Sequence, residues 1–162
     1  MRTIEKARPS DLSELLGIYN IARDFMRKNG NQNQWGSGYP GEKLLLRDLS
    51  EGNLYVLKAG GIPSAAFVLA IGKEPNYEKI DNGAWLSDTE YGTIHRVASN
   101  GRLTGVFADI LTFCEHKISH LRIDTHRDNL IMQKLIERNG FTKCGIIYIR
   151  EDGTPRIAYE KV

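Results

Sequence analysis

The stretch from residue 94 to residue 107, Ile-His-Arg-Val-Ala-Ser-Asn-Gly-Arg-Leu-Thr-Gly-Val-Phe, has the residue order that most clearly suggests chemistry. It predicts a short apolar strand, a turn with Gly101 and Gly105, and a helix that begins at about Thr104. The first backbone N–H groups of a helix have no partner within it, and they attract anions together with the helix dipole. The turn is therefore a candidate cradle for the phosphates of a cofactor that carries a pyrophosphate.

Titratable side chains lie on the predicted strand at 91–98 and just after the predicted strand at 121–125. Tyr91 and His95 share one face of the strand before the turn, whereas Glu90 faces the other way. His126 follows the next strand, within the polar run Asp-Thr-His-Arg-Asp-Asn that begins at Asp124. Because an imidazole in water titrates near neutral pH, His95 and His126 are candidates for proton transfer, with Tyr91 as a third proton acceptor. We expect the polar run to contribute to catalysis or to acceptor binding.

Structural interpretations compete with the functional ones for each of these residues. His95 also fits a buried, hydrogen-bonded position, and His126 also fits a residue that caps a loop. Glu90 could attract a protonated amine, although solvated acids are common on protein surfaces. Trp35 and Tyr39 stand among small polar residues, where their rings either plug the loop onto the core or face a substrate.

Composition limits the classes of protein and partner. The chain has 162 residues, 41% of them hydrophobic and 26% charged, as expected for a globular protein. A net charge of +2 without blocks of like charge argues against nucleic acid as a partner. We expect no membrane partner and a cytoplasmic location, because no apolar run could span a bilayer and the N-terminal residues carry charges. Two cysteines and four histidines show no zinc-binding spacing, so we expect no metal.

Hydrophobic periodicity predicts alternating strands and helices along the whole chain. Strands are expected at 2–7, 54–58, 62–71, 91–98, 121–125, 142–149 and 155–160, and helices at about 9–30, 41–49, 104–117 and 129–139. No linker divides the sequence, so residues 1–162 are expected to form a single domain. This order predicts an α/β (α+β) fold with a mixed sheet and helices on its faces.

The turn and its neighbours resemble the GNAT superfamily of N-acetyltransferases, and the resemblance covers essentially the whole chain. In that family, a turn of the form basic-or-Gln, x, x, Gly, x, Gly-or-Ala binds the pyrophosphate of acetyl-CoA through backbone amides. Arg102 and Gly105 match this pattern, whereas Phe107 stands where a small residue is expected.

A later helix adds a second set of matches. The family's helix begins with an Asn and ends with Gly-Phe, as do Asn129 and the Gly140-Phe141 pair here. Ile136 stands where the family often has a Tyr that protonates the leaving thiolate. Another group or solvent must then supply that proton, or the thiolate leaves without assistance, because a thiol is far more acidic than an alcohol.

The resemblance implies a mixed, mostly antiparallel sheet of about seven strands with helices on both faces. It implies that the sheet is splayed between the strands at 91–98 and 120–125, and that the pantetheine of acetyl-CoA lies in the splay like an added strand. The residues that it assigns to acetyl-CoA are Val97, Ala98, Ser99, Arg102, Leu103, Thr104, Gly105, Val106, Phe107 and Asn129.

Residues and resemblance together predict an N-acetyltransferase, an acyltransferase that transfers an acetyl group from acetyl-CoA to a primary amine of a small molecule or peptide. The amine would attack the thioester directly. The candidate catalytic residues are Tyr91, His95 and His126, and the candidate acceptor-binding residues are Trp35, Tyr39 and Glu90. The alternative is a non-catalytic acyl-CoA-binding or sensor domain on the same fold, which Ile136 and Phe107 would favour. The edges of the final strands would allow a homodimer.

Overall fold

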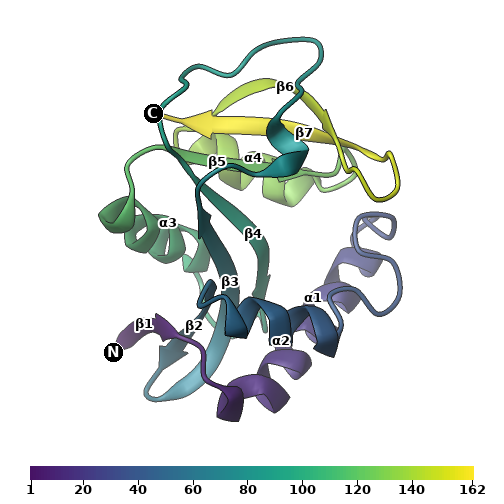
Figure 1. Cartoon of the computed structure of the whole chain (residues 1–162). Coiled ribbons are helices and arrows are strands. Elements are labelled where there is room, and N and C mark those ends of the chain that lie inside the picture. Colours follow the sequence, from purple (N-terminus) through teal and green to yellow (C-terminus); the bar gives the residue numbers. More distant parts are fainter.

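The strands form one continuous sheet. The computed structural model describes residues 1–162, and its seven strands lie in the order β1-β2-β3-β4-β5-β7-β6 (Figure 1). They are β1 (Arg2–Lys6), β2 (Leu54–Ala59), β3 (Ile62–Ile71), β4 (Gly92–Ser99), β5 (Leu121–Thr125), β6 (Thr142–Tyr148) and β7 (Pro155–Lys161). Neighbouring strands are antiparallel except β4 and β5, which are parallel. The predicted mixed, mostly antiparallel sheet is confirmed, and its continuity supports the proposal of a single domain at 1–162.

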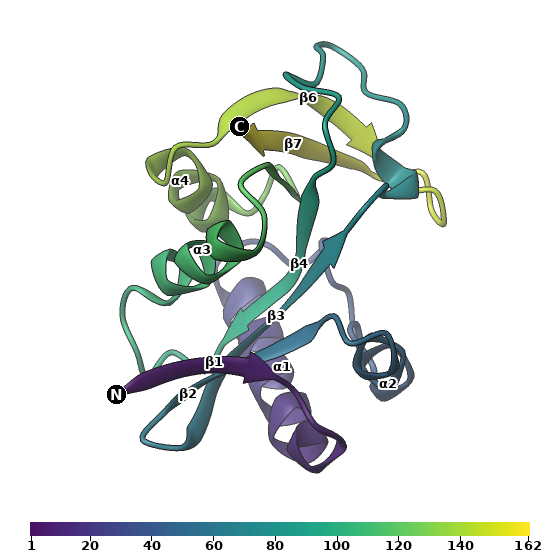
Figure 2. The same cartoon turned by 60° about the vertical axis from the view of Figure 1, so that its left-hand side comes forward.

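Helices cover both faces of this sheet. They are α1 (Leu12–Lys28), α2 (Glu42–Ser50), α3 (Val106–Lys117) and α4 (Leu130–Arg138), with the short 3-10 turns η1 (Pro9–Asp11) and η2 (Pro75–Tyr77). α1 and α2 lie on one face, and α3 and α4 lie on the other (Figure 2). No helix of the chain combines the length and the apolar character needed to cross a lipid bilayer.

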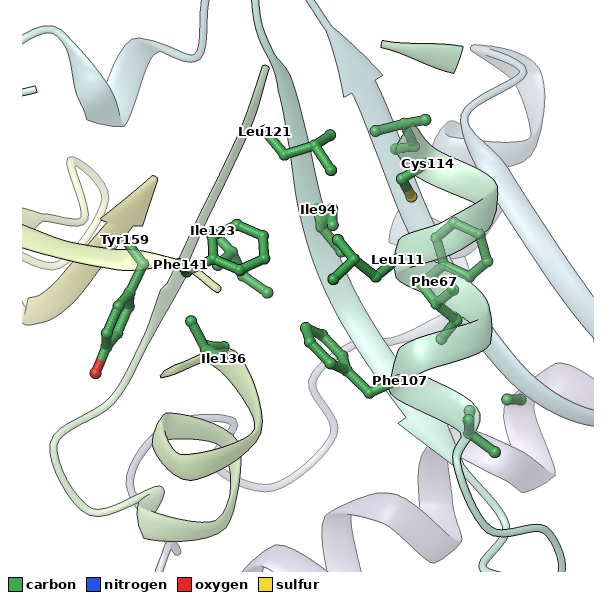
Figure 3. Close-up of a cluster of buried hydrophobic side chains, with 14 of the residues drawn as sticks. Phe67, Ile94, Phe107, Leu111, Cys114, Leu121, Ile123, Ile136, Phe141 and Tyr159 are labelled. Atoms are coloured by element: carbon green, nitrogen blue, oxygen red, sulfur yellow. The ribbon is translucent and has the colours of Figure 1, made fainter. Parts of the chain in front are cut away.

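Each face of the sheet packs its own apolar cluster. Leu15, Ile18 and Tyr19 recur at helical spacing on α1 and are buried with residues of β2 and β3. On the other face, Phe107 of α3 and Ile136 of α4 belong to a cluster of 17 buried residues (Figure 3). β3 lies between the two clusters and is buried over most of its length, as its apolar run predicts.

The strand that precedes the glycine turn separates from its neighbour. β4 and β5 pair only from Gly92–Leu121 to Ile94–Ile123. On its other edge, β4 stays paired with β3 as far as Ser99. Beyond Ile94 the β4 edge that faces β5 therefore has no partner strand. The predicted splay is present between these two strands.

Residues 72–91, of which only the last belongs to a predicted strand, pack against β5 and β7. The guanidinium carbon of Arg122 on β5 lies 4.0 Å from the ring centroids of both Trp85 and Tyr91. The backbone N–H of Leu86 donates to the buried carboxylate of Glu160 on β7. A cation between two rings and a buried charge-assisted hydrogen bond hold this segment in place, although it contains no strand and no helical turn other than η2.

Candidate active site

The glycine turn leads directly into α3, as predicted, although the helix starts two residues later than expected. Gly105 is the N-cap and has a left-handed backbone with φ of 71°, and nothing lies within 4 Å of where its Cβ would be. Side chains of Ser99 and Asn100 accept the N–H groups of Gly101 and Arg102 at 3.1 Å. The backbone N–H groups of residues 103–108 have no acceptor in the protein. Several donors thus meet at the positive end of a helix.

The apolar side chains of this segment turn away from those donors. Val106 and Phe107 are 8% and 5% exposed, and Phe107 points into the core cluster near Ile136 (Figure 3). The bulk of Phe107 therefore lies in the interior and leaves the solvent side of the turn open. Arg102 and Thr104 are exposed at the turn, and Arg2 donates to the carbonyl of Thr104 at 2.8 Å.

A bulge in β4 marks the point where the strand leaves β5. Ala98 pairs with Ala66 and His95 pairs with Val68, so Arg96 and Val97 together face one residue of β3. Arg96 has a positive φ of 49°, which is rare outside glycine, and its carbonyl accepts the hydroxyl of Tyr19 at 2.7 Å.

A second interaction, through the side chain of Arg96, also stabilises this strained backbone conformation. Arg96 makes a two-point ion pair with buried Asp48 of α2, at 2.8 and 2.7 Å. α1, through Tyr19, and α2 therefore both hold the bulge in place.

A cleft of about 1100 Å³ opens beside the bulge. Its walls come from β3, β4, β5, β7, α2, α4 and the loops around residues 33–39, 74–76 and 149–152. Of the residues that the sequence assigned to function, Trp35, Tyr39, His95, Val97 and Asn129 line it. Several segments far apart in sequence thus meet around a single space next to the unpaired β4 edge.

His95 forms a pair with a residue that sequence reasoning missed. Its Nε2 lies 3.2 Å from a carboxylate oxygen of Glu74, and its Nδ1 has no partner in the protein. Burial raises the pKa of Glu74, but the hydrogen bond and charge of His95 outweigh burial and hold that pKa below its usual value. Tyr91, the third candidate base, accepts the backbone N–H of Glu74 at 2.8 Å and is 8% exposed. Tyr91 does not line the cleft and instead positions Glu74.

Asp124 is a second carboxylate on the cleft wall. The hydroxyl of Tyr77 donates to it at 2.6 Å. Burial raises the pKa of Asp124, against the lowering influence of His95, Tyr77 and Arg156. Asp124 opens the polar run that the sequence predicts to be functional, and the structure brings this residue, but not His126, to the cleft.

His126 and Asn129 both organise the start of α4. Nδ1 of His126 accepts the backbone N–H of Asp128 at 3.0 Å, and burial lowers the pKa of this histidine. His126 lies outside the cleft lining, so its geometry favours the loop-capping role. Asn129 is the N-cap of α4 and accepts the N–H of Met132 at 3.1 Å, while its amide donates to Gln34 at 3.0 Å.

The three candidate acceptor-binding residues have different positions. Trp35 is 8% exposed and packs against Tyr19, so it both plugs the loop and contributes to the cleft wall. Tyr39 is 41% exposed, and its hydroxyl accepts a hydrogen bond from Arg96 at 3.4 Å. Glu90 is exposed and lies outside the cleft lining.

Solved structures share this architecture. A GNAT-family acetyltransferase from Streptococcus agalactiae 2603 matches with a TM-score of 0.90 and 28% identity, over 99% of this chain and 95% of that one. This chain has the GNAT acetyltransferase fold. A GNAT-family acetyltransferase from Listeria monocytogenes 4b F2365 matches with a TM-score of 0.71 and 15% identity, over 99% of this chain and 94% of that one. The ribosomal-protein-S18-alanine N-acetyltransferase from Escherichia coli matches with a TM-score of 0.64 and 17% identity, over 99% and 93%.

The likeness is one of structure more than of sequence. No protein-family model and no curated protein sequence matches the chain. The GNAT fold implies binding of an acyl-CoA. The residues present fit that ligand, because free N–H donors stand at the N-terminus of α3 and the unpaired β4 edge can bond to amides of an extended arm. Ile136, where the family often has Tyr, is fully buried in the core and offers no proton.

Proposed function

We propose that this chain transfers an acetyl group from acetyl-CoA to a primary amine of a small molecule or peptide. The observation that carries the proposal is the position of the His95–Glu74 pair in a cleft beside the unpaired edge of β4. This position would combine a binding site for the acyl donor and a group able to accept a proton from the amine in one space. An acyl-CoA sensor would need only the first of these.

Backbone groups would hold the donor. The N–H groups of residues 103–108 and the exposed side chain of Arg102 would bind the pyrophosphate, and backbone groups from Val97 to Ser99 would bond to the pantetheine amides. When bound, acetyl-CoA supplies the activated thioester. N–H groups at the β4 bulge would polarise its carbonyl, and the rigid anchoring of Arg96 keeps them in position.

His95 would act as the general base. If the Glu74 carboxylate accepts the Nε2–H of His95, the lone pair of the imidazole lies on Nδ1, which has no partner in the protein. Nδ1 would take a proton from the acceptor ammonium, directly or through a water molecule. The negative charge of Glu74 would stabilise the imidazolium, and Tyr91 would keep Glu74 in place. Because Ile136 has no hydroxyl, solvent or protonated His95 would supply the proton to the departing thiol.

The test of this proposal measures thiol release from acetyl-CoA with a panel of primary amines. Replacement of His95 by Ala should lower kcat by about 10²–10³-fold, in the range of general-base catalysis. The Kd for acetyl-CoA, from calorimetry, should stay within about twofold. His116→Ala is the matched control, because His116 is exposed on α3 and outside the cleft. Tight binding of acetyl-CoA without acetylation of any amine would favour the sensor domain, and full activity of His95→Ala would refute the role of this histidine.

A further inference from the structure

Arg156 on β7 is a buried cation with unused hydrogen-bonding capacity. The residue is 8% exposed and lines the cleft. Its Nη1 donates to Thr154 Oγ1 and to the Pro155 carbonyl at 3.0 Å, and its Nη2 donates to the Gln34 carbonyl at 3.3 Å. Its Nε makes no hydrogen bond in the protein, and the second N–H of Nη2 also has no partner. Two donors therefore remain free on the guanidinium.

No carboxylate lies within ion-pair distance of Arg156, in contrast to the other arginines of comparable burial. Arg96 is paired with Asp48, and Arg122 is paired with Glu160. Removing a guanidinium from water without a counter-charge is costly, so natural proteins pair nearly all such groups. An unpaired one that faces a cleft points to an anionic ligand.

The sheet places this cation on the same face as the proposed base. Ala158 pairs with Asp124 across β7 and β5, so Arg156, two residues before Ala158, shares that face. Thr93 pairs with Arg122 across β4 and β5, so His95, two residues after Thr93, shares the face as well. One ligand in the cleft can therefore meet His95 at one end and Arg156 at the other.

We propose that the acceptor amine also carries a carboxylate, which Arg156 binds, so that the substrates of this chain are amino acids or closely related amino acid-like compounds. The inference rests on the proposed acetyl transfer and names its acceptor class. The two free N–H donors match the two oxygens of a carboxylate. A phosphate dianion fits less well, because Asp124 and Asp152 line the same cleft and would repel a doubly charged ligand more strongly than a singly charged carboxylate.

The experiment compares each amino acid of a panel with its own primary carboxamide as acceptor. The carboxamide keeps the amine and side chain and loses only the negative charge. The wild-type ratio of kcat/KM, acid over amide, should be at least about 100, because a site built around a buried charge discriminates strongly against a ligand without its partner. The change Arg156→Met should bring this ratio close to one, chiefly through KM for the acid. Arg156→Lys should restore part of it.

Arg150→Met is the matched control. Arg150 also lines the cleft, but it is exposed and already paired with Glu78. This variant should keep the acid-over-amide ratio of the wild type. Should Arg156→Met fail to fold, the ratios of the wild type and of Arg156→Lys still decide.

The outcomes separate this inference from the proposed function. Acetylation of amines with an acid-over-amide ratio near one in the wild type, or an unchanged ratio in Arg156→Met, would overturn the inference and leave the acetyltransferase intact. If no amine is acetylated, the proposed function fails. In that case, calorimetry of the same acids and amides still tests whether Arg156 binds a carboxylate. Equal affinities for each acid and its amide would overturn this role.

Discussion

Two histidine–glutamate pairs lie on one face of the sheet, and their surroundings differ. His120, just before β5, is paired with Glu160 of β7, with exposed side-chain fractions of 6% and 0%. His95 of β4 is paired with Glu74, with exposed side-chain fractions of 20% and 17%. The residue types are identical, so the difference in role must come from what else each pair contacts.

The His120–Glu160 pair is closed by further bonds. Glu160 also accepts from Arg122 at 3.1 Å and from the backbone N–H of Leu86, and Nδ1 of His120 bonds with Thr89 at 2.9 Å. Both ring nitrogens and both carboxylate oxygens are therefore occupied. Such a pair can hold residues 72–91 on the sheet, but it offers no lone pair to a substrate.

The His95–Glu74 pair leaves one ring nitrogen without a hydrogen-bond partner. Nδ1 of His95 has no protein partner and the residue lines the cleft. The same contrast separates Arg122, which is bonded to Glu160 and stacked between two rings, from Arg156, which retains free N–H groups at the cleft. In this fold, incomplete hydrogen bonding next to a cavity distinguishes the candidate functional groups from the structural ones better than residue type does.

The largest expected effect comes from breaking the closed pair. Glu160→Ala leaves Arg122 buried without its counter-charge and His120 without its hydrogen-bond partner, so the free energy of unfolding should fall by about 3–5 kcal/mol. Urea denaturation followed by circular dichroism measures it. Glu115→Ala is the control: it removes an exposed ion pair with Lys161 and should cost at most about 1 kcal/mol. Equal losses in the two variants would contradict the structural role of the buried pair.

A change in the His95–Glu74 pair should lower activity more than stability. Glu74→Gln can still accept the imidazole N–H but no longer stabilises the imidazolium, so kcat/KM should fall by about 10- to 100-fold. The stability loss should stay under about 1 kcal/mol, because the pair is partly solvated. Steady-state kinetics across pH 6–9 measures the first quantity, and urea denaturation the second.

Glu78→Gln is the control for that variant, since Glu78 follows η2 and bonds only with exposed Arg150. It should leave both quantities unchanged. A large stability loss in Glu74→Gln, with kcat/KM retained, would instead make His95–Glu74 a second structural pair.

Local patterns in the sequence were sufficient for the elements but not for the site. The apolar spacing of α1 and the unbroken apolar run of β3 depend on local periodicity, and their structures match the expectations. α3 starts two residues later than the sequence predicts, because Gly105 adopts a left-handed N-cap conformation, and sequence patterns locate a helix end only to within a few residues.

The residues missed or misplaced depend on long-range packing. Glu74 lies 21 positions before His95, and its position depends on the docking of residues 72–91 by Arg122. Proline after Glu74 signals a turn but not where that turn lies in space. Arg156 shows no special pattern on its strand, and only the strand order β5-β7-β6 brings it to the cleft. The polar run that begins at Asp124 stands out in the sequence, yet only the position of β5 beside the splay brings Asp124 to the cleft wall.

The smallest expected effect is on the pH dependence of stability. Glu160, which is fully hydrogen-bonded, and Asp124, which lies on the cleft wall, should change stability with pH in opposite directions. Burial raises the pKa of Glu160, but the Leu86 N–H, His120 and Arg122 outweigh it and lower that pKa below its unfolded value. Glu160 therefore contributes stability above the usual glutamate pKa of about 4.3, and this contribution disappears as the pH falls through its lower folded pKa. Asp124 behaves oppositely, because burial raises its folded pKa and its ionisation then opposes folding.

Stability measured from pH 3 to pH 7 in two variants tests this contrast. Glu160→Gln should be less stable than the wild type at pH 7, with a difference that shrinks as the pH falls below about 4. Asp124→Asn keeps an acceptor for the Tyr77 hydroxyl and removes the buried charge, so it should be more stable than the wild type at pH 7. That advantage should vanish below the usual aspartate pKa of about 3.9, where both states are protonated. If both variants were less stable than the wild type at pH 7, the charge of Asp124 would be as well compensated by its neighbours as the charge of Glu160.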